Sequence, residues 1–271
     1  MKRKSRSSGT SRSASGGSLT VVGTGIQLVQ QLTPEARDAL EQADEVLYVV
    51  ADPVTGTWLE SLNANARSLS HLYRPGPARA QIYAEMVDEI LAAVRRGSRV
   101  CAVFYGHPGV FVTPSHQAVE RARAAGYPAQ MLPAISAEAC LFADLGVDPA
   151  ERGWQSYEAT EFLLRGHQLD PTAGLVLWQV DAVGKLDWDP KPDPRGLHIL
   201  TERLRELYPP DHRVVFYRAS TYPIAGAQTD SMTLEQTSGL VAAPGPTLYV
   251  PPLARRPIDA EMARRLRITP S

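Results

Sequence analysis

The first half of the chain alternates short apolar runs with longer segments in which apolar residues recur at helical spacing. The apolar runs have the length of strands and lie at residues 19–22, 45–51, 99–105 and 130–132. The helical segments lie at residues 33–42, 82–96 and 114–125, and a further one begins at Ala137. Strands that alternate with helices predict an α/β domain with a mainly parallel sheet.

Each of these predicted strands stops at a glycine, a proline or an aspartate. In an open parallel sheet, ligands bind beyond the carboxyl ends of the strands. The loops that hold Gly23, Gly106 and Ser136 follow three such ends. We therefore expect these three loops to form a ligand site.

The second half repeats this organisation from about Glu158 onward. It has predicted strands at residues 174–180, 213–218 and 247–250 and a predicted helix at residues 197–207. Residues 182–195 contain three prolines and several charges, so they are expected to form a loop. A length of 271 residues suits two packed lobes better than one average domain.

Composition narrows the class of protein. A hydrophobic fraction of 44% and a charged fraction of 21% are typical of an ordinary globular protein. The apolar runs are too short to span a bilayer, and the basic start continues into Ser and Gly rather than into a signal peptide. Cys101 and Cys140 lie in apolar patterns, without the spacing of a disulfide framework or a metal site. We therefore expect a cytoplasmic protein with no membrane partner and no metal.

Charge is distributed unevenly along the chain. Residues 1–17 hold five basic residues and no acid, which leaves 23 basic and 29 acidic residues in the rest. A basic tail rich in Ser and Gly can touch nucleic acid, but it cannot bury enough apolar surface to fold. We interpret residues 1–17 as a disordered basic tail and expect no nucleic-acid partner.

Two glycine-containing loops are the first candidates for chemistry. Gly23-Thr24-Gly25 lacks the third glycine of the dinucleotide fingerprint, so by itself it predicts only a tight turn. The segment Tyr105–Phe111 is more informative, because glycine and proline build a rigid loop and two aromatic rings offer faces that attract a sulfonium. His107 and His116 lack the spacing of a complete metal site, which favours a hydrogen-bonding role for His107.

A third constellation combines two phenols with a guanidinium. Arg79 and Tyr83 are four residues apart at a helix start and share one face, and Tyr73 lies just before them. On spacing alone this is either ordinary amphipathic surface or a site that polarises a carbonyl and removes a proton. In the second interpretation, Arg79 stabilises an oxyanion and lowers the pKa of a neighbouring tyrosine.

The motifs in their order resemble the tetrapyrrole-methylase superfamily and, more narrowly, the methyltransferase domain of the borosin peptide α-N-methyltransferases. The principal motifs are Gly23-Thr24-Gly25, Tyr48–Pro53, Tyr105–Val112 and Pro133–Glu138. Further agreement is found at Phe142–Pro149, Glu158–Glu161, Trp178–Val180, Tyr249–Pro252 and Pro257–Asp259. The resemblance runs from about Ser18 to Arg267.

The resemblance implies a two-lobed α/β fold, with lobes at residues 18–155 and 156–271, each a mainly parallel or mixed sheet flanked by helices. It implies S-adenosyl-L-methionine in the cleft between the lobes, S-adenosyl-L-homocysteine as a product, a homodimer, and a peptide whose backbone nitrogens receive methyl groups. By this similarity the catalytic group is Tyr73, Arg79 and Tyr83. The implied cofactor-binding residues are Tyr105, His107, Val110, Phe111, Ser136, Ala137, Gln179, Tyr217, Ala219, Pro246 and Thr247.

The chain departs from the family pattern at three places. Ala134 stands where glycine is usual, and Pro77-Ala78 stands where borosins often have basic residues. Fused borosins continue into a clasp and a core peptide, whereas this sequence stops at Ser271. Either the precursor peptide is separate, as in split borosins, or the chain is truncated, and we expect a separate precursor peptide methylated in trans. Two alternatives remain open: a precorrin or uroporphyrinogen C-methyltransferase, and a non-catalytic module that binds a peptide or the cofactor.

Overall fold

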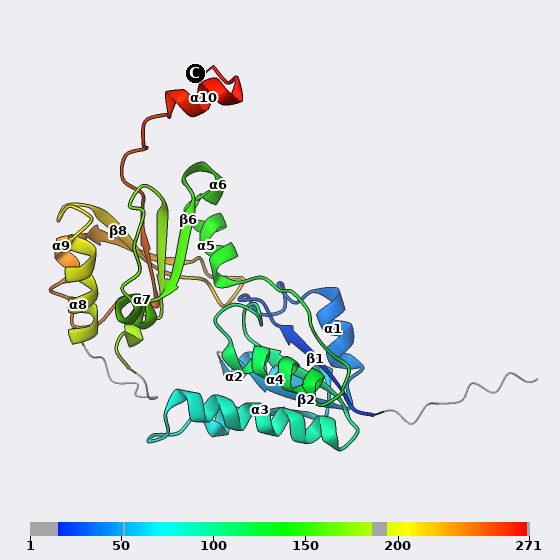
Figure 1. Cartoon of the computed structure of the whole chain (residues 1–271). Coiled ribbons are helices and arrows are strands. Elements are labelled where there is room, and N and C mark those ends of the chain that lie inside the picture. The colour runs from blue at the N-terminus through cyan, green and yellow to red at the C-terminus, as the bar shows by residue number, and fades with distance from the viewer. Residues whose placement is uncertain (1–15, 51, 186–193, 270–271) are drawn as a thin grey trace, which may run out of the picture. The chain divides into compact units, whose positions relative to one another are not determined.

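The computed structural model describes residues 16–50, 52–185 and 194–269, and the chain divides into two compact units, Met1–Ser136 and Ala137–Ser271 (Figure 1). Most of the predicted basic tail and the central part of the predicted loop at 182–195 lie outside the described residues. Among the described residues, no helix has both the length and the apolar character needed to cross a membrane.

The first unit is built on a parallel sheet of five strands in the order β3-β2-β4-β1-β5. Its strands are β1 (Ser18–Gly23), β2 (Glu45–Val49), β3 (Ala66–Ser68), β4 (Arg99–Phe104) and β5 (Ala129–Met131). Its helices are α1 (Pro34–Glu41), α2 (Pro53–Leu62), the 3-10 helix η1 (Ser70–Leu72), α3 (Arg79–Arg95) and α4 (Thr113–Ala124). The mainly parallel sheet predicted for this half is confirmed.

Both faces of this sheet are buried, because alternate side chains of each strand point to opposite sides. In β4, Val100, Ala102 and Phe104 join one core cluster with the apolar residues of α3 and α4. Cys101 and Val103 point the other way and pack with residues of α1 and α2. The sheet is therefore held between two layers of helices, and its strands read as continuous apolar runs.

The second unit contains a mixed five-stranded sheet in the order β6-β7-β10-β8-β9. Its strands are β6 (Trp154–Glu158), β7 (Gly174–Trp178), β8 (Arg213–Arg218), β9 (Gln228–Thr233) and β10 (Thr247–Val250). Its helices are α5 (Ala137–Leu145), α6 (Pro149–Arg152), α7 (Ala159–Arg165), the 3-10 helix η2 (Val180–Ala182), α8 (Pro194–Arg205), α9 (Leu234–Thr237) and α10 (Ala260–Leu266). β6 and β7 are parallel, and the other neighbouring pairs are antiparallel.

The helix α5 packs against the second sheet. Its residue Leu141 is fully buried against Val176 and Trp178 of β7, and the indole of Trp154 donates to the Glu138 carboxylate at 2.8 Å. The units therefore meet at residues 136 and 137, earlier than the boundary at residues 155 and 156 that the sequence predicted. The apolar pattern of α5 identifies a buried helix but not the sheet that it covers.

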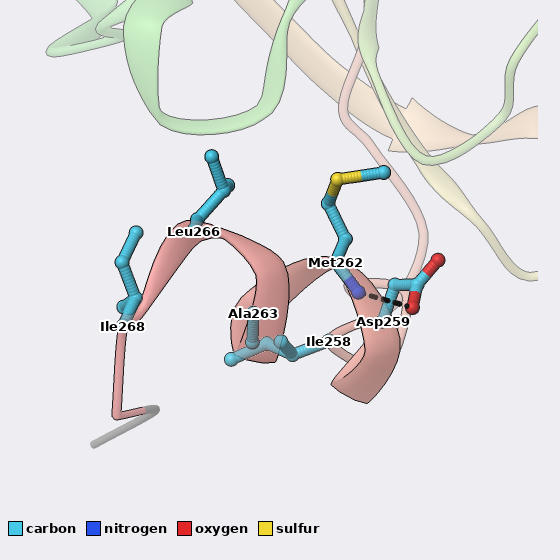
Figure 2. A pocket seen from close by; sticks show the side chains of 6 residues that line it. All are labelled: Ile258, Asp259, Met262, Ala263, Leu266 and Ile268. Atoms are coloured by element: carbon cyan, nitrogen blue, oxygen red, sulfur yellow. Dashed lines mark hydrogen bonds between the residues drawn. The ribbon is translucent and has the colours of Figure 1, made fainter.

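The helix α10 carries an exposed apolar face. Ile258, Met262, Leu266 and Ile268 are each between 43% and 62% exposed, and together with Asp259 and Ala263 they line a hollow of about 230 Å³. Figure 2 shows these side chains and the Asp259 carboxylate, which caps the helix by accepting from the Met262 N–H at 3.0 Å. None of the sequence-predicted site residues lines this hollow.

Candidate active site

The carboxyl ends of β1, β4 and β5 bring the glycine and proline loops together. The Gly106 N–H donates to the Gly25 carbonyl at 2.8 Å, and the Gly25 N–H donates back at 3.3 Å. A Cβ on Gly23 would lie 2.1 Å from the Gly106 oxygen and 2.8 Å from the Ala134 Cβ, so no side chain fits there. The three loops therefore pack against one another at the strand ends.

The loop at residues 105–111 is ordered by its own histidine and by the first turn of α4. The Gly109 N–H donates to His107 Nδ1 at 2.9 Å, and the Val110 N–H donates to the His107 carbonyl at 3.1 Å. The Ser115 hydroxyl donates to the Pro108 carbonyl. This geometry agrees with a hydrogen-bonding role for His107. Among the described residues, no group of three or more His, Cys, Asp or Glu side chains could hold a metal ion.

Two aromatic rings of this loop are presented to solvent. Tyr105 is 53% exposed and Phe111 is 47% exposed, although both residues are large and apolar. Phe111 also has a φ of 56°, in the left-handed region that bulky residues avoid. Backbone strain of this kind persists where the surrounding structure holds it, and it is concentrated at binding sites. The loop therefore has the form of a preorganised aromatic surface.

The predicted group Tyr73, Arg79 and Tyr83 is brought together at the same end of the first unit. Tyr73 follows η1, Arg79 is the first residue of α3, and Tyr83 lies one turn further on. All three side chains are half-buried. Tyr73 and Tyr83 pack against the same apolar cluster, and Tyr83, Tyr105 and Arg79 each influence the pKa of Tyr73. Sequence reasoning assigned Tyr105 to the cofactor alone and did not connect it with the other two tyrosines.

The proton of Tyr73 is held more firmly than usual. Its pKa is raised to about 12, mainly by burial and in smaller part by the Tyr83 and Tyr105 phenols, and the Arg79 charge opposes them with a smaller effect. Arg79 does lower the pKa of Tyr73, but its effect is smaller than that of desolvation, so the net pKa is raised. At neutral pH this phenol is a hydrogen-bond donor.

Another group of predicted residues lies at one end of the three central strands of the second sheet. Thr247, at the start of β10, pairs with Tyr217 of β8 and with Trp178 of β7, next to Gln179. The Pro246 carbonyl accepts from the Val180 N–H at 3.0 Å. Gln179 has a φ of 59°, in the same left-handed region as Phe111.

The side chain of Tyr217 faces the core rather than solvent. It is 1% exposed, and its hydroxyl donates to the Asp144 carboxylate of α5 at 2.6 Å. Burial is the main cause that raises its pKa, and the Asp144 carboxylate adds to the effect. Ala137 and Ala219 pack against the same cluster.

Comparison with known proteins identifies the fold and the family. The model of the tetrapyrrole (corrin/porphyrin) methylases matches residues 18–229. The uroporphyrin-III-C-methyltransferase of Thermus thermophilus has a similar fold, with a TM-score of 0.60 and 22% identity, covering 87% of this chain and 92% of that one. The methyltransferase CobJ gives a TM-score of 0.58 at 20% identity, covering 90% and 97%.

Closer relatives are fungal proteins whose names join a methyltransferase to a peptide precursor. The dendrothelin A precursor of Dendrothele bispora is 42% identical, covering 94% of this chain and 62% of its own length. The omphalotin A precursor of Omphalotus olearius is 40% identical, covering 97% of this chain and 64% of its own length. A type I borosin precursor of Coprinopsis marcescibilis is 41% identical, covering 94% of this chain and 68% of its own length. This chain thus spans about two thirds of their length or somewhat less. It belongs to the tetrapyrrole methylase family and, within it, to the group of the borosin methyltransferases.

Proposed function

We propose that this chain is an S-adenosylmethionine-dependent methyltransferase that N-methylates backbone amides of a ribosomally made peptide, as in borosin biosynthesis. The observation that carries the proposal is the meeting of Tyr73, Arg79, Tyr83 and Tyr105 at the end of the first sheet. Donors and a permanent charge beside an exposed aromatic loop suit a reaction at a polar carbonyl group. The names of the relatives supply the substrate class.

The loops of the first unit fit the proposed methyl donor. S-adenosylmethionine carries a positive sulfonium that supplies an electrophilic methyl group. Aromatic faces attract such a cation, and Tyr105 and Phe111 expose theirs on one short loop. Gly23 and Gly25 allow the turns at these strand ends to pack closely, because an added Cβ would meet the Gly106 oxygen at 2.1 Å or the Gln31 Cβ at 2.3 Å.

The chemistry of an amide explains the residue types at the site. The amide nitrogen is a poor nucleophile, because its lone pair is delocalised into the carbonyl. In our proposal Arg79 and the protonated Tyr73 bind the carbonyl oxygen and stabilise its developing negative charge. In the same proposal Tyr83 acts as its phenolate and accepts the N–H proton, becoming the neutral phenol, while Tyr73 stays protonated.

We further propose that the peptide is supplied as a separate molecule, and that the active form is a cytoplasmic homodimer. The four groups on which the proposed chemistry depends all belong to the first unit of this chain. A peptide added in trans therefore meets a complete set of catalytic side chains.

The test is methylation of a peptide by the purified chain. A precursor encoded beside its gene is incubated with the protein and S-adenosylmethionine, and mass spectrometry locates each added methyl on the backbone. A precorrin offered in parallel tests the tetrapyrrole alternative, and methylation of the precorrin with none of the peptide would refute the proposal. Binding of the methyl donor without any methylated product would support the non-catalytic alternative.

Three substitutions test the catalytic group. We expect Arg79→Lys, Tyr73→Phe and Tyr83→Phe each to lower kcat by about 100-fold or more, the usual effect of losing an oxyanion donor or a proton acceptor. Arg95→Lys is the matched control, because it makes the same exchange at the exposed last residue of the same helix. Near-normal turnover in all three variants would overturn the assignment.

A further inference from the structure

A charged cluster lies immediately beside Tyr73. Arg74 binds the Glu85 carboxylate through two parallel hydrogen bonds, of 2.7 Å from Nη1 to Oε2 and 2.8 Å from Nη2 to Oε1. Arg74 Nη1 also donates to the Leu72 carbonyl at 3.0 Å, and the Gln81 amide donates to Glu85 at 3.1 Å. A bidentate arginine–carboxylate pair fixes direction as well as distance.

The segment that this cluster joins to α3 has little other support. Among the described residues, the backbone groups of residues 74–77 make no hydrogen bond to another backbone group. Gly76 has a φ of 107° and open space around it, and Ala78 caps α3 without a side-chain hydrogen bond. The Arg74 side chain therefore links the chain just after Tyr73 to α3, as the contact between His71 and Glu89 at 3.0 Å links the chain just before it.

The cluster lies on a different face of α3 from the proposed catalytic residues. Arg79 and Tyr83 are one turn apart on one face, and Gln81 and Glu85 are one turn apart on another. Two positions along a helix turn the side chain by about 200°, so Glu85 projects away from Tyr83. Any effect of the ion pair on the site must therefore pass through the backbone next to Tyr73.

We propose that Arg74 and Glu85 are positioning residues that hold the Tyr73 phenol against Arg79 and Tyr83. This inference rests on the proposed function of the site. The side chains are 43% and 30% exposed, and exposed ion pairs contribute little to stability. Loss of the pair leaves the fold intact but releases the segment that carries Tyr73, and small misplacements of a reacting group cost large factors in rate.

The chain offers a closely matched control pair. Arg67 binds Glu89 of the same helix at 2.6 Å, and the two side chains are 44% and 30% exposed. Arg67 lies in β3, before η1 and Tyr73. We expect Arg74→Gln to lower kcat about tenfold with an unchanged KM for the methyl donor, and Arg67→Gln to keep both constants. Exchange of the charges in the double variant Arg74→Glu/Glu85→Arg is expected to restore most of the lost kcat.

Coupling to Tyr73 separates positioning from a general structural effect. In a Tyr73→Phe background, Arg74→Gln should lower the residual rate by much less than tenfold, because both substitutions act on the same step. Equal kcat of Arg74→Gln and Arg67→Gln, or full additivity with Tyr73→Phe, would overturn the proposal.

A readout independent of turnover keeps the two proposals apart. Fluorotyrosine placed at position 73 reports its surroundings by fluorine NMR. We expect its signal to shift or broaden in Arg74→Gln but not in Arg67→Gln. An unchanged signal in both variants refutes the positioning role, whatever the substrate is. A changed signal in a protein that methylates no peptide keeps the positioning role and refutes the proposed function.

Discussion

Among single residues, burial decides what the phenol groups do. Tyr73 is surrounded by two other phenols and an arginine, yet desolvation is the largest influence on its pKa. Tyr48 and Tyr217 donate their hydroxyls to carboxylates, at 2.6 Å in each case. Tyr208 is 2% exposed, and its hydroxyl has no hydrogen-bond partner among the described residues.

The unsatisfied hydroxyl of Tyr208 leads to a prediction about stability. A buried polar group without a partner costs about 1 kcal/mol or more, so Tyr208→Phe should raise the free energy of unfolding by about that amount. Burial raises the pKa of Tyr208 to about 12. In the unfolded chain the Tyr208 phenol loses its proton at about pH 10. Between pH 10 and pH 12 this side chain therefore lowers the free energy of unfolding as the pH rises, and Tyr208→Phe removes that contribution.

Urea unfolding at neutral pH and at about pH 11, between the unfolded and folded pKa values, measures both effects. Tyr48→Phe is the contrasting variant. It removes the hydrogen bond that the Tyr48 hydroxyl donates to Glu60, so it should lower the free energy of unfolding. If Tyr208→Phe lost as much stability as Tyr48→Phe, the hydroxyl would have a partner in solution.

Among the elements, helices and strands with strong apolar periodicity or clear caps were predicted from the sequence. Edge strands with a weak apolar pattern were missed. Thr33 and Pro34 marked the start of α1, and the predicted strands at 213–218 and 247–250 match β8 and β10. The edge strand β9 was missed, because Gln228–Thr233 has one large apolar residue and most of its side chains are exposed. Sequence spacing predicted that Tyr73, Arg79 and Tyr83 lie near one another. The position of Tyr105 beside them depends on the place of β4 in the sheet, and local sequence patterns do not predict strand order.

The junction of the strand ends gives an element-scale prediction. Gly23→Ala would place a methyl 2.1 Å from the Gly106 carbonyl, a backbone atom that cannot turn aside. We expect a loss of about 2 kcal/mol or more in the free energy of unfolding, with weaker binding of the methyl donor by calorimetry. Gly239→Ala is the control, because its added Cβ meets only an ordinary contact at 3.8 Å. Equal stability of the two variants would show that the loops separate easily.

In the whole molecule, each unit has its own apolar core and its own acidic groups with lowered pKa values. In the first unit, hydrogen bonds from the Arg99 side chain are the main cause that lowers the pKa of Asp44 to about 2. In the second unit, hydrogen bonds from Thr172 are the main cause that lowers the pKa of Asp170, and Arg256 assists. Chains with separate cores can unfold in more than one step, so acid can act on each unit through its own carboxylates.

A final prediction follows from the sign of these shifts. Because the folded pKa of Asp44 is below its unfolded value of about 4, its contribution is complete above that pH and is lost as the pH falls toward about 2. Asp44→Asn should therefore make the stability of the first unit less sensitive to pH in this window and leave the second unit unchanged. Asp170→Asn should do the reverse. Hydrogen exchange followed by peptide mass spectrometry, measured from neutral pH down to about pH 3, distinguishes the units, and a response of both units to either variant would mean that they unfold as one.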